Sequence, residues 1–253
     1  MIFTPIKTAK FIPPKDTIEK LITPILPQLK ENMIVVITSK IVSIIEGNCI
    51  PKSEVSDKDQ LVIDQSEYYL PRNAVPNNWL IHTIKEGTFI PTAGIDLSNA
   101  KDYVILWPIK PLDSAKRILK LLKQKTKIKN LGIIISDSHS IPMRRGLTGI
   151  SIAHTGFNPL YDYRGKKDLF GRELEVSMSN IPDSLASSSV LQMGEGEEQT
   201  PIVLISDLPK SVKFSLKKPQ SNKPFSTFLV PMEEDLFKPF LTSVPWKKGG
   251  IKK

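Results

Sequence analysis

Apolar and polar residues follow one another in short blocks along the chain, and these blocks predict strands and helices in irregular order. Residues 33–38 and 131–136 are continuous, largely β-branched runs, which indicates strands buried on both faces. Residues 114–125 carry leucine and isoleucine at helical spacing behind Asp113, the expected N-cap. Further strands are expected at residues 2–6, 80–84, 103–107 and 201–206, and further helices at 16–29 (N-cap Asp16), 55–69, 182–193 and 232–240. Residues 40–45 either extend the preceding strand or begin a helix.

This mixture lacks a regular β-α alternation and therefore predicts an α+β fold with mixed or antiparallel sheets and flanking helices. Residues 1–208 are expected to form one domain, and the Lys-, Pro- and Ser-rich residues 209–253 an extension that packs on it. The longest apolar stretch, residues 33–45, is interrupted by Lys40 and is too short to cross a bilayer. The N-terminus lacks a signal-peptide pattern, and the single cysteine, Cys49, suits a reducing compartment. We expect a cytoplasmic protein with no membrane partner.

The formal charge of +9 favours anionic partners such as phosphates, polyglutamates or nucleic acid. Seven basic residues fall within residues 116–129, on the predicted helix, where a solvated helix face is the preferred interpretation. Zinc-finger spacing, an aromatic RNA-binding signature and a long Arg-rich arm are all missing from the sequence. The sequence therefore argues against nucleic acid as the partner.

Two segments with candidate chemistry follow the second buried run. Asp137 comes directly after it in Ser-Asp-Ser-His-Ser, where a carboxylate can hold a divalent cation or, alternatively, cap a turn. Arg144 and Arg145 follow closely, and guanidinium groups bind phosphates and carboxylates bidentately, although an isolated pair is more often a surface feature. The charged stretch 162–173 contains two glycines and Asp168, which is either a second metal ligand or part of a solvated loop.

A third segment, residues 193–201, alternates glycine and glutamate just before a predicted strand. Its backbone N–H groups are free to meet phosphate oxygens, although an acidic surface turn has the same composition. It is not a Walker A loop, and the chain has neither a G-x-S-x-G elbow nor histidines spaced for zinc. Three carboxylate-bearing loops without a nucleophile favour metal-assisted phosphoryl chemistry.

Taken in order, several short motifs carry a resemblance to a known family. They are Thr38-Ser39-Lys40 with Glu46-Gly47, Ala93-Gly94-Ile95-Asp96 with Ser98-Asn99, Ser114-Ala115, Ser136-Asp137-Ser138, Arg144-Arg145-Gly146, Arg164-Gly165 with Asp168, Gly171-Arg172-Glu173-Leu174 and Met193-Gly194-Glu195-Gly196. The set resembles the γ-glutamyl ligases typified by the enzyme that adds glutamate to the precursor of the deazaflavin coenzyme F-420. The resemblance covers roughly residues 5–206.

The resemblance implies an intertwined homodimer that consumes GTP (or ATP) and forms an amide bond to L-glutamate through an acyl phosphate. Asp137 and Asp168 would hold Mg²⁺ or Mn²⁺, and Glu195 with the Leu169 carbonyl a second such ion, while K⁺ is a further candidate ion. The nucleotide would lie against Ser39, Lys40, Ser140, Met193, Gly194, Gly196, Glu197 and Thr200, with help from residues 10–13. Substrate carboxylates would be clamped by Arg144, Arg145 or Arg172.

Two departures from the family pattern bear on the acceptor. Ile44 stands where the deazaflavin-coenzyme enzymes carry a nucleotide-binding lysine, and Ser-Asp-Ser-His-Ser replaces their Thr-Asp-Thr-x-Gly-Arg. The pattern is more similar to the bacterial branch associated with folate metabolism, so a folate- or pterin-type acceptor is predicted first. The alternatives are the deazaflavin precursor as acceptor and a non-catalytic nucleotide-binding homologue.

Overall fold

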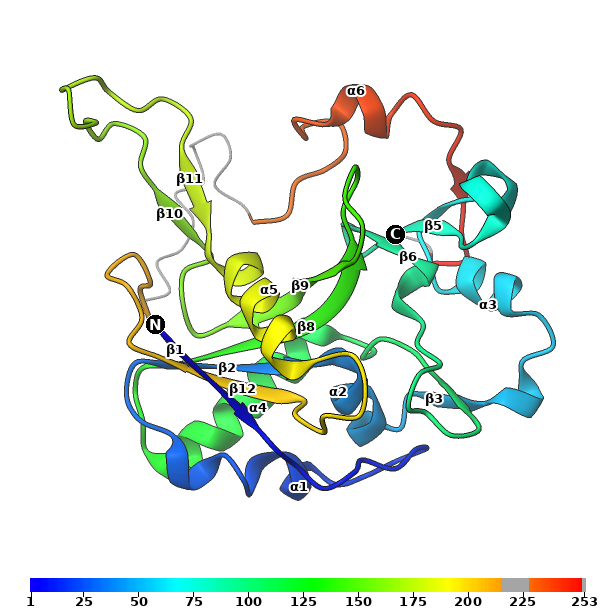
Figure 1. The fold of residues 1–253 in the computed structure, drawn as a ribbon, viewed down its shortest axis with the longest axis horizontal. Coiled ribbons are helices and arrows are strands. Elements are labelled where there is room, and N and C mark those ends of the chain that lie inside the picture. The colour runs from blue at the N-terminus through cyan, green and yellow to red at the C-terminus, as the bar shows by residue number, and fades with distance from the viewer. Residues whose placement is uncertain (215–227, 252–253) are drawn as a thin grey trace.

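A five-stranded sheet forms the centre of the molecule, as seen in a computed structural model that describes residues 1–214 and 228–251 (Figure 1). Its strands run in the order β1 (Ile2–Ile6), β12 (Ile202–Ser206), β2 (Met33–Thr38), β8 (Leu131–Ser140) and β9 (Leu147–Thr155). Strands β2 and β8 are parallel, whereas the other neighbours are antiparallel. The α+β prediction is confirmed.

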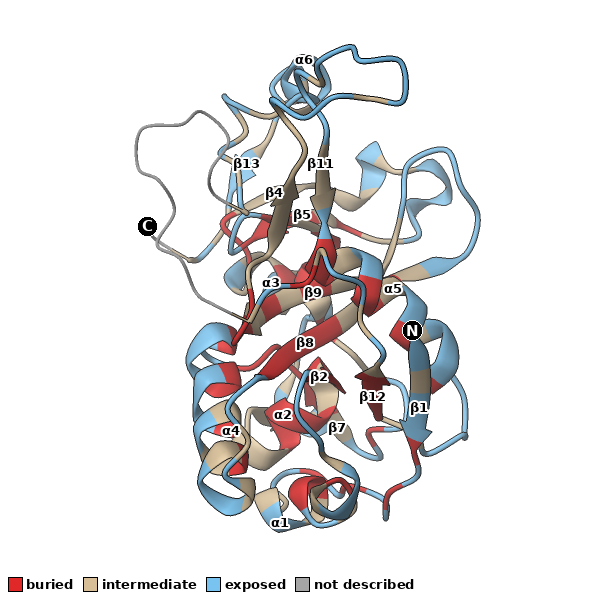
Figure 2. Cartoon of the chain, turned by 90° about the vertical axis from the view of Figure 1, so that its left-hand side faces the viewer, coloured by how far each residue is buried: buried red, intermediate tan, exposed pale blue. Residues whose placement is uncertain are grey.

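Both faces of this sheet are covered, which explains the continuous apolar runs of β2 and β8. Val35 and Ile37 pack on one face with residues of α1 (Ile18–Ile22), α2 (Ser39–Glu46) and α4 (Pro111–Thr126). Ile34 and Val36 point to the other face and pack with residues of α5 (Ile181–Met193). Successive side chains therefore alternate between two cores, and the buried strands lie between the helices in Figure 2.

A smaller layer lies between β2 and β8 in the sequence. It contains β4 (Tyr68–Leu70), β5 (His82–Lys85) and β6 (Thr88–Pro91), the pair β3 (Cys49–Pro51) and β7 (Tyr103–Ile105), and α3 (Lys58–Asp64). Short 3-10 helices are η1 (Leu26–Gln28), η2 (Lys52–Glu54), η3 (Arg72–Ala74), η4 (Pro76–Asn78) and η5 (Thr92–Gly94). Near the C-terminus, α6 (Lys238–Leu241) precedes β13 (Lys247–Lys248), which pairs with β4.

An arm projects from the body at the upper left of Figure 1. It consists of β10 (Leu160–Asp162), β11 (Met178–Asn180) and the loop of residues 163–177 between them. In this loop the side chains of Leu169, Phe170 and Val176 are 99%, 94% and 82% exposed. Apolar residues are thus presented to solvent at the end of a narrow projection.

Most of the elements expected from the sequence are present, with five notable differences in their extent. The strand expected at 131–136 continues to Ser140 because β9, which was not predicted, pairs with its polar half. The first helix ends at Ile22 because Pro24 and Pro27 follow, and its N-cap is Thr17, one residue after Asp16. Asp113 lies inside the first turn of α4, whose N-cap is Lys110.

The remaining differences are truncations. The helix expected at 55–69 is only α3, because residues 68–70 pair as a strand, and the one expected at 232–240 is only α6. Residues 40–45 are helical, within α2. Part of the predicted loop, residues 215–227, lies outside the described residues. Across the part of the chain that the structure describes, no helix combines the length and apolar character needed to cross a membrane.

Candidate functional site

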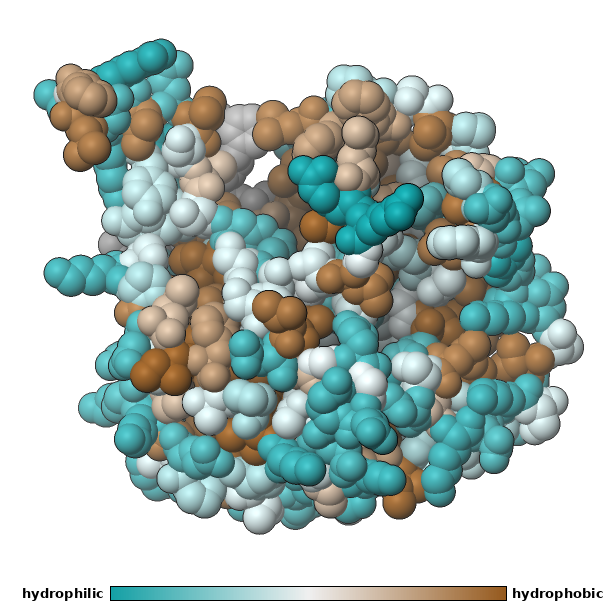
Figure 3. Space-filling view, viewed as in Figure 1, coloured by the Kyte–Doolittle hydropathy of each residue, from teal (hydrophilic) through white to brown (hydrophobic). Residues whose placement is uncertain are grey.

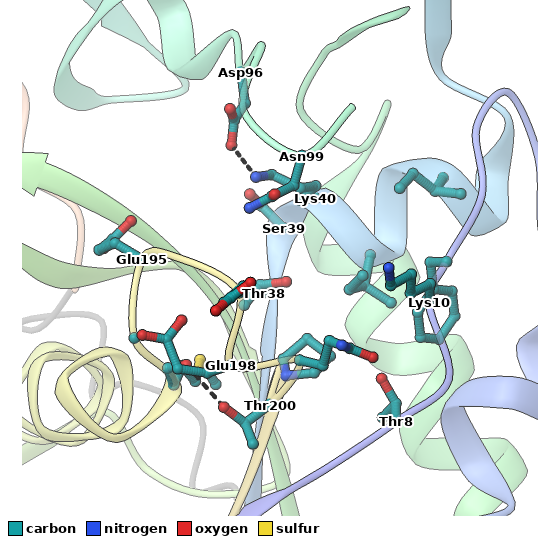
Figure 4. Close-up of a pocket in the computed structure, with 18 of the residues that line it drawn as sticks. Thr8, Lys10, Thr38, Ser39, Lys40, Asp96, Asn99, Glu195, Glu198 and Thr200 are labelled. Carbon is teal, nitrogen blue, oxygen red and sulfur yellow. Dashed lines mark hydrogen bonds and ion pairs between the residues drawn. The ribbon is translucent and has the colours of Figure 1, made fainter. Parts of the chain in front are cut away.

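A cavity of about 760 Å³ opens at one edge of the central sheet. Five segments line it: residues 8–13, the start of α2, a turn at 96–101, residues 136–138 of β8, and the loop 193–201 after α5. In Figure 4, Asp96, Asn99 and Lys40 lie on one side of this cavity, and Glu198 and Thr200 lie on the opposite side. Segments far apart in the sequence therefore meet here.

The parallel pairing of β2 with β8 explains this convergence. Thr38 lies opposite Ser136, so the residues that follow each of them leave the sheet at the same edge. Ser39 begins α2 directly after β2, and Asp137 follows Ser136 within β8. The register with β9 shifts between Ile135 and Ser136, a bulge of the kind that re-aims side chains beside active sites.

Lys40 connects α2 to the turn on the far side of the cavity. Its Nζ forms an ion pair with Asp96 Oδ2 at 2.6 Å and donates to Ser98 O at 3.0 Å and Ser98 Oγ at 2.9 Å. Asp96 Oδ1 in turn accepts from the backbone N–H of Ser98 at 2.6 Å. The Lys40 ammonium is thereby fixed in place.

Asp137 is held from two directions. The indole Nε1–H of Trp107 donates to its Oδ2, and the backbone N–H of Ser138 donates to its Oδ1 at 2.9 Å. Burial raises the pKa of Asp137 to about 7, against the lowering effect of these hydrogen bonds, and the charge of Asp96 adds to the rise. Protonation is therefore easier here than at an ordinary aspartate.

Glu195 belongs to the same electrostatic group. Burial raises the pKa of its carboxyl, and the charges of Asp96 and Glu198 act in the same direction, whereas Lys40 and a hydrogen bond with Ser138 lower it. Two carboxyls with raised pKa values thus share one ammonium with Asp96. Excess negative charge among oxygen ligands is the environment that hard divalent cations prefer.

The loop between α5 and β12 is closed by its own hydrogen bonds. The backbone N–H of Gly196 donates to Glu198 Oε2 at 2.8 Å, Asn99 Nδ2 donates to Gly196 O at 2.9 Å, and Thr200 Oγ1 donates to Met193 O at 2.8 Å. Gly194 has a φ of +74°, and a Cβ there would lie 2.3 Å from Glu198 Cδ. A side chain at this position would displace the Glu198 carboxylate.

The cavity brings together nine of the residues expected at the site. They are Ser39, Lys40, Asp137, Met193, Gly194, Glu195, Gly196, Glu197 and Thr200. Ser140 lies farther along β8 and does not line it, and Arg144 and Arg145 are exposed beyond the end of that strand. Asp168, Leu169 and Arg172 lie on the arm, away from the cavity lining. The roles of all fifteen residues stay predictions.

Among residues 1–214 and 228–251, no three His, Cys, Asp or Glu side chains are close enough to hold a metal ion together. The oxygen donors that do line the cavity are of the right chemical kind for Mg²⁺ or Mn²⁺, since they include the carboxylates of Asp137, Asp96 and Glu195. The chemistry of the donors fits a hard cation, but one described chain alone does not complete its coordination.

Several residues at or behind the cavity received no role from the sequence, among them Asp96, Asn99, Thr8 and Trp107. Asp96 and Asn99 lie within the motifs quoted for the resemblance, and Thr8 follows the first strand. The signal for Asp96 and Asn99 was a polar turn after Gly94, which alone is typical of any loop. Trp107 was assigned to an apolar strand, and its contact with Asp137 is between residues 30 positions apart, which no local pattern indicates.

Comparison with known proteins identifies the family to which this chain belongs. The family model described as F420-0:gamma-glutamyl ligase matches residues 6–207, and the chain therefore belongs to this family of ligases. It is similar to the coenzyme F420:L-glutamate ligase of Methanocaldococcus jannaschii, with 31% identity over 226 residues that cover 83% of this chain and 86% of that protein.

The same name is carried by similar proteins from Methanopyrus kandleri and Archaeoglobus fulgidus. The first is 31% identical, covering 81% of this chain and 86% of that protein. The second is 35% identical over 150 residues, covering 59% of this chain and 58% of that protein. The predicted family is confirmed.

Proposed function

We propose that this protein is a nucleotide- and divalent-metal-dependent ligase that joins L-glutamate through an amide bond to a carboxylate of a coenzyme F420-type acceptor. The observation that carries the proposal is the cavity, in which Lys40 and the carboxylates of Asp96, Asp137 and Glu195 converge at the edge of two parallel strands. Membership of the ligase family and the names of the relatives supply the reaction and the acceptor.

The reaction needs two displacements. The acceptor carboxylate attacks the γ-phosphorus of the nucleoside triphosphate, so a C–O–P link forms and the nucleoside diphosphate leaves. The amine of glutamate then attacks the acyl carbon, inorganic phosphate leaves, and the amine loses a proton to solvent. Lys40 and loop 193–201 line the cavity, and we propose that the lysine ammonium and the N–H groups of the loop would meet phosphate oxygens there and stabilise their negative charge.

A divalent cation bound among these carboxylates would neutralise charge on the phosphoryl oxygens. Asp137 and Glu195 are the metal ligands proposed from the described cavity. Asp96 is not proposed as a ligand, because its carboxylate already forms an ion pair with Lys40. The nucleotide is GTP or ATP, and K⁺ stays a prediction. Cytoplasmic location stays a prediction as well.

The remaining ligands are proposed to come from a second copy of the chain. Asp168 and the Leu169 carbonyl, together with Arg172 as the proposed carboxylate clamp, lie on the arm, which presents exposed apolar side chains at its end, at the upper left of Figure 3. Monomeric proteins seldom expose two adjacent large apolar side chains almost completely, as Leu169 and Phe170 are exposed here. A homodimer in which each arm reaches the cavity of the other protomer would cover them and complete the metal site.

A folate- or pterin-type acceptor is the second candidate, and it rests on a position inside the cavity. Ile44 lines the cavity at the place where the family pattern has a nucleotide-binding lysine, so the charge available to the substrates differs there. The sequence motifs favoured the folate- or pterin-type acceptor. The names of the relatives favour the deazaflavin acceptor instead.

One assay separates these acceptors. The purified protein is incubated with GTP or ATP, with Mg²⁺ or Mn²⁺, with isotope-labelled glutamate and with either the deazaflavin precursor or a reduced folate or pteroate. Mass spectrometry is expected to detect the deazaflavin product with one added glutamate, together with released phosphate. The matched control is Asp113→Asn on the exposed side of α4, which should retain activity, beside Asp137→Asn, which should lose it. Nucleotide binding without phosphate release on every acceptor would overturn the enzyme proposal.

A further inference from the structure

A buried tryptophan lies directly behind Asp137. Trp107 is only 2% exposed, and its indole N–H donates to Asp137 Oδ2 while Ser138 N–H holds the other carboxylate oxygen. Trp107 is not part of the cavity lining, so it contacts Asp137 from the protein side. The orientation of the carboxylate is therefore set by two fixed donors rather than by solvent.

The indole itself is held by the backbone around it. Gly94 packs against the ring so closely that a Cβ there would lie 1.8 Å from Trp107 Nε1, and its φ of +69° also favours glycine. On the main chain, Asn48 Nδ2 donates to Trp107 O at 2.6 Å, which ties the residue to the end of α2. The ring therefore cannot turn its N–H away from Asp137 without disturbing η5.

A buried lysine also lies against the Trp107 ring. Lys85, on β5, is 4% exposed, and its Nζ lies 5.4 Å from the centroid of the Trp107 ring. The same ammonium lies 3.3 Å from Gln65 Oε1 and 3.5 Å from Ala93 O. Within the described residues it forms no ion pair. Burial lowers the pKa of Lys85 to about 8, while the charges of Glu86 and Asp137 oppose this, so the group is still mainly cationic at neutral pH.

A buried ammonium without an ion pair destabilises a fold, and an apolar side chain in its place would be more favourable for packing. Its position therefore indicates a role at the site rather than in the core. A cation over an indole face is attracted by the ring and polarises it, and polarisation strengthens a hydrogen bond donated by the same ring. Lys85, Trp107 and Asp137 thus form one chain of contacts that ends in the cavity.

We propose that Lys85 and Trp107 are positioning residues for Asp137, with Lys85 acting through the indole to hold the carboxylate in the orientation that binds a divalent cation. The inference rests on the proposed metal-dependent function. Neither residue touches a substrate. Outer groups that orient a metal ligand typically change metal affinity when they are removed, even though they never contact the ion.

The test is Mn²⁺ binding to the full-length, metal-free protein, measured by isothermal titration calorimetry without substrates. Trp107→Phe keeps the ring and removes the N–H, and it is expected to weaken Mn²⁺ binding by about 10- to 100-fold. Lys85→Met keeps the stem and removes the charge, and it should weaken binding by a smaller factor. Because Lys85 acts through the indole, the double variant should bind Mn²⁺ as Trp107→Phe does.

The matched control is Trp246→Phe, since the Trp246 indole N–H also donates a hydrogen bond, to Leu241 O at 2.7 Å, and Trp246 neither lines the cavity nor donates to Asp137. This variant should bind Mn²⁺ as the wild type does. Factors that multiply in the double variant would overturn the coupling, and an unchanged affinity in Trp107→Phe would overturn the whole inference. A wild type that binds no Mn²⁺ would instead overturn the proposed metal site, and this inference with it.

Thermal unfolding accompanies each titration. If Trp107→Phe does not fold, the comparison of Lys85→Arg with Lys85→Met decides the matter, because arginine keeps a cation over the ring and methionine does not. Weaker Mn²⁺ binding in Lys85→Met alone would support the positioning role. Equal affinities in these two variants would overturn it.

Discussion

The cavity wall and the arm carry residues expected to serve one reaction, yet they are built in opposite ways. In the wall, Lys40 and Asp137 are fixed by contacts that reach across the fold, to Asp96 and to Trp107. In the arm, contacts are local: Asp168 Oδ1 accepts from the N–H groups of Phe170 and Arg172 at 2.8 and 2.9 Å.

Both regions are therefore preorganised, but only the wall is finished within one chain. The arm already has its shape, because its loop is cross-linked by backbone hydrogen bonds such as Gly165 N to Leu174 O at 2.9 Å. A preformed arm loses little conformational freedom when it docks, which favours binding to a second protomer. In the proposed dimer, Asp168 would thus be held rigidly by its own chain and would act in the site of the other.

The largest effect is expected in the wall. Asp137→Asn should lower glutamate ligation by at least about 100-fold, because the neutral amide cannot serve as an anionic metal ligand. The melting temperature should not fall, since the substitution also removes a carboxyl whose pKa is raised by burial. Initial rates and differential scanning fluorimetry measure the two quantities. Near-normal activity would remove Asp137 from the reaction.

The next effect tests whether the arm serves another chain. Mixing Asp137→Asn with Asp168→Asn, each inactive alone, should restore about one quarter of wild-type activity, because half of the randomly mixed dimers contain one intact shared site. The mixture is refolded together and assayed against each parent. Recovery would be absent if Asp137 and Asp168 served within the same protomer or if the arm had no part in catalysis.

The apolar end of the arm gives a companion measurement. Phe170→Asp should convert the dimer to a monomer in light scattering, since it places a charge in the interface, whereas Leu112→Asp on α4 should not. A monomeric wild type would contradict the shared site directly.

A third prediction concerns the charge buried behind the wall. Lys85 has a folded-state pKa of about 8 against 10.5 for an ordinary lysine, so between these pH values the unfolded chain binds more protons. Stability from this group rises as the pH increases through that window, and it is lost as the pH falls through about 8. Lys85→Met should therefore be more stable than the wild type by about 3 kcal/mol at pH 7, and the difference should vanish near pH 10.5.

Urea unfolding at several pH values measures this difference. The control is Lys167→Met on the arm, which removes an exposed lysine in place of a buried one. A constant difference for Lys85→Met would mean that its ammonium is not desolvated in the folded protein.

The smallest effect compares one glycine from each region. Gly171 on the arm has a φ of +85° with no atom within 4 Å of an added Cβ, so Gly171→Ala should cost only about 1 kcal/mol for the left-handed backbone. Gly194→Ala should cost more and lower activity, because its Cβ would displace Glu198. Urea unfolding and ligation rates measure both. A loss of stability in Gly171→Ala as large as that in Gly194→Ala would contradict the difference between the two positions.

Local patterns predicted the regular parts of this molecule and several of the residues that line its cavity. Residues 33–38 and 131–136 were identifiable because both faces of each strand are apolar, and Asp137 because it ends such a run. The hairpin partner β9 was not predicted, although its burial alternates along its length, because its sequence mixes serine, threonine and glycine with the apolar residues.

The roles of Asp96 and Trp107 depend on long-range contacts, Lys40 to Asp96 and Trp107 to Asp137, that no periodicity encodes. The position of Asp168 could not be predicted for a different reason. The loop that carries Asp168 is held by local hydrogen bonds. The position of that loop in the molecule, however, depends on the direction in which strands β10 and β11 project.

Strand β12 lies between β1 and β2 in the central sheet, although it is the last of the five to be synthesised. As the ribosome makes the chain, Ile2–Ile6 therefore has no sheet partner until residues 202–206 emerge, and Met33–Thr38 presents an open apolar edge for the same interval. Such edges pair readily with other nascent chains. The segment that closes this gap follows directly after loop 193–201, so closure of the central sheet and completion of the cavity coincide.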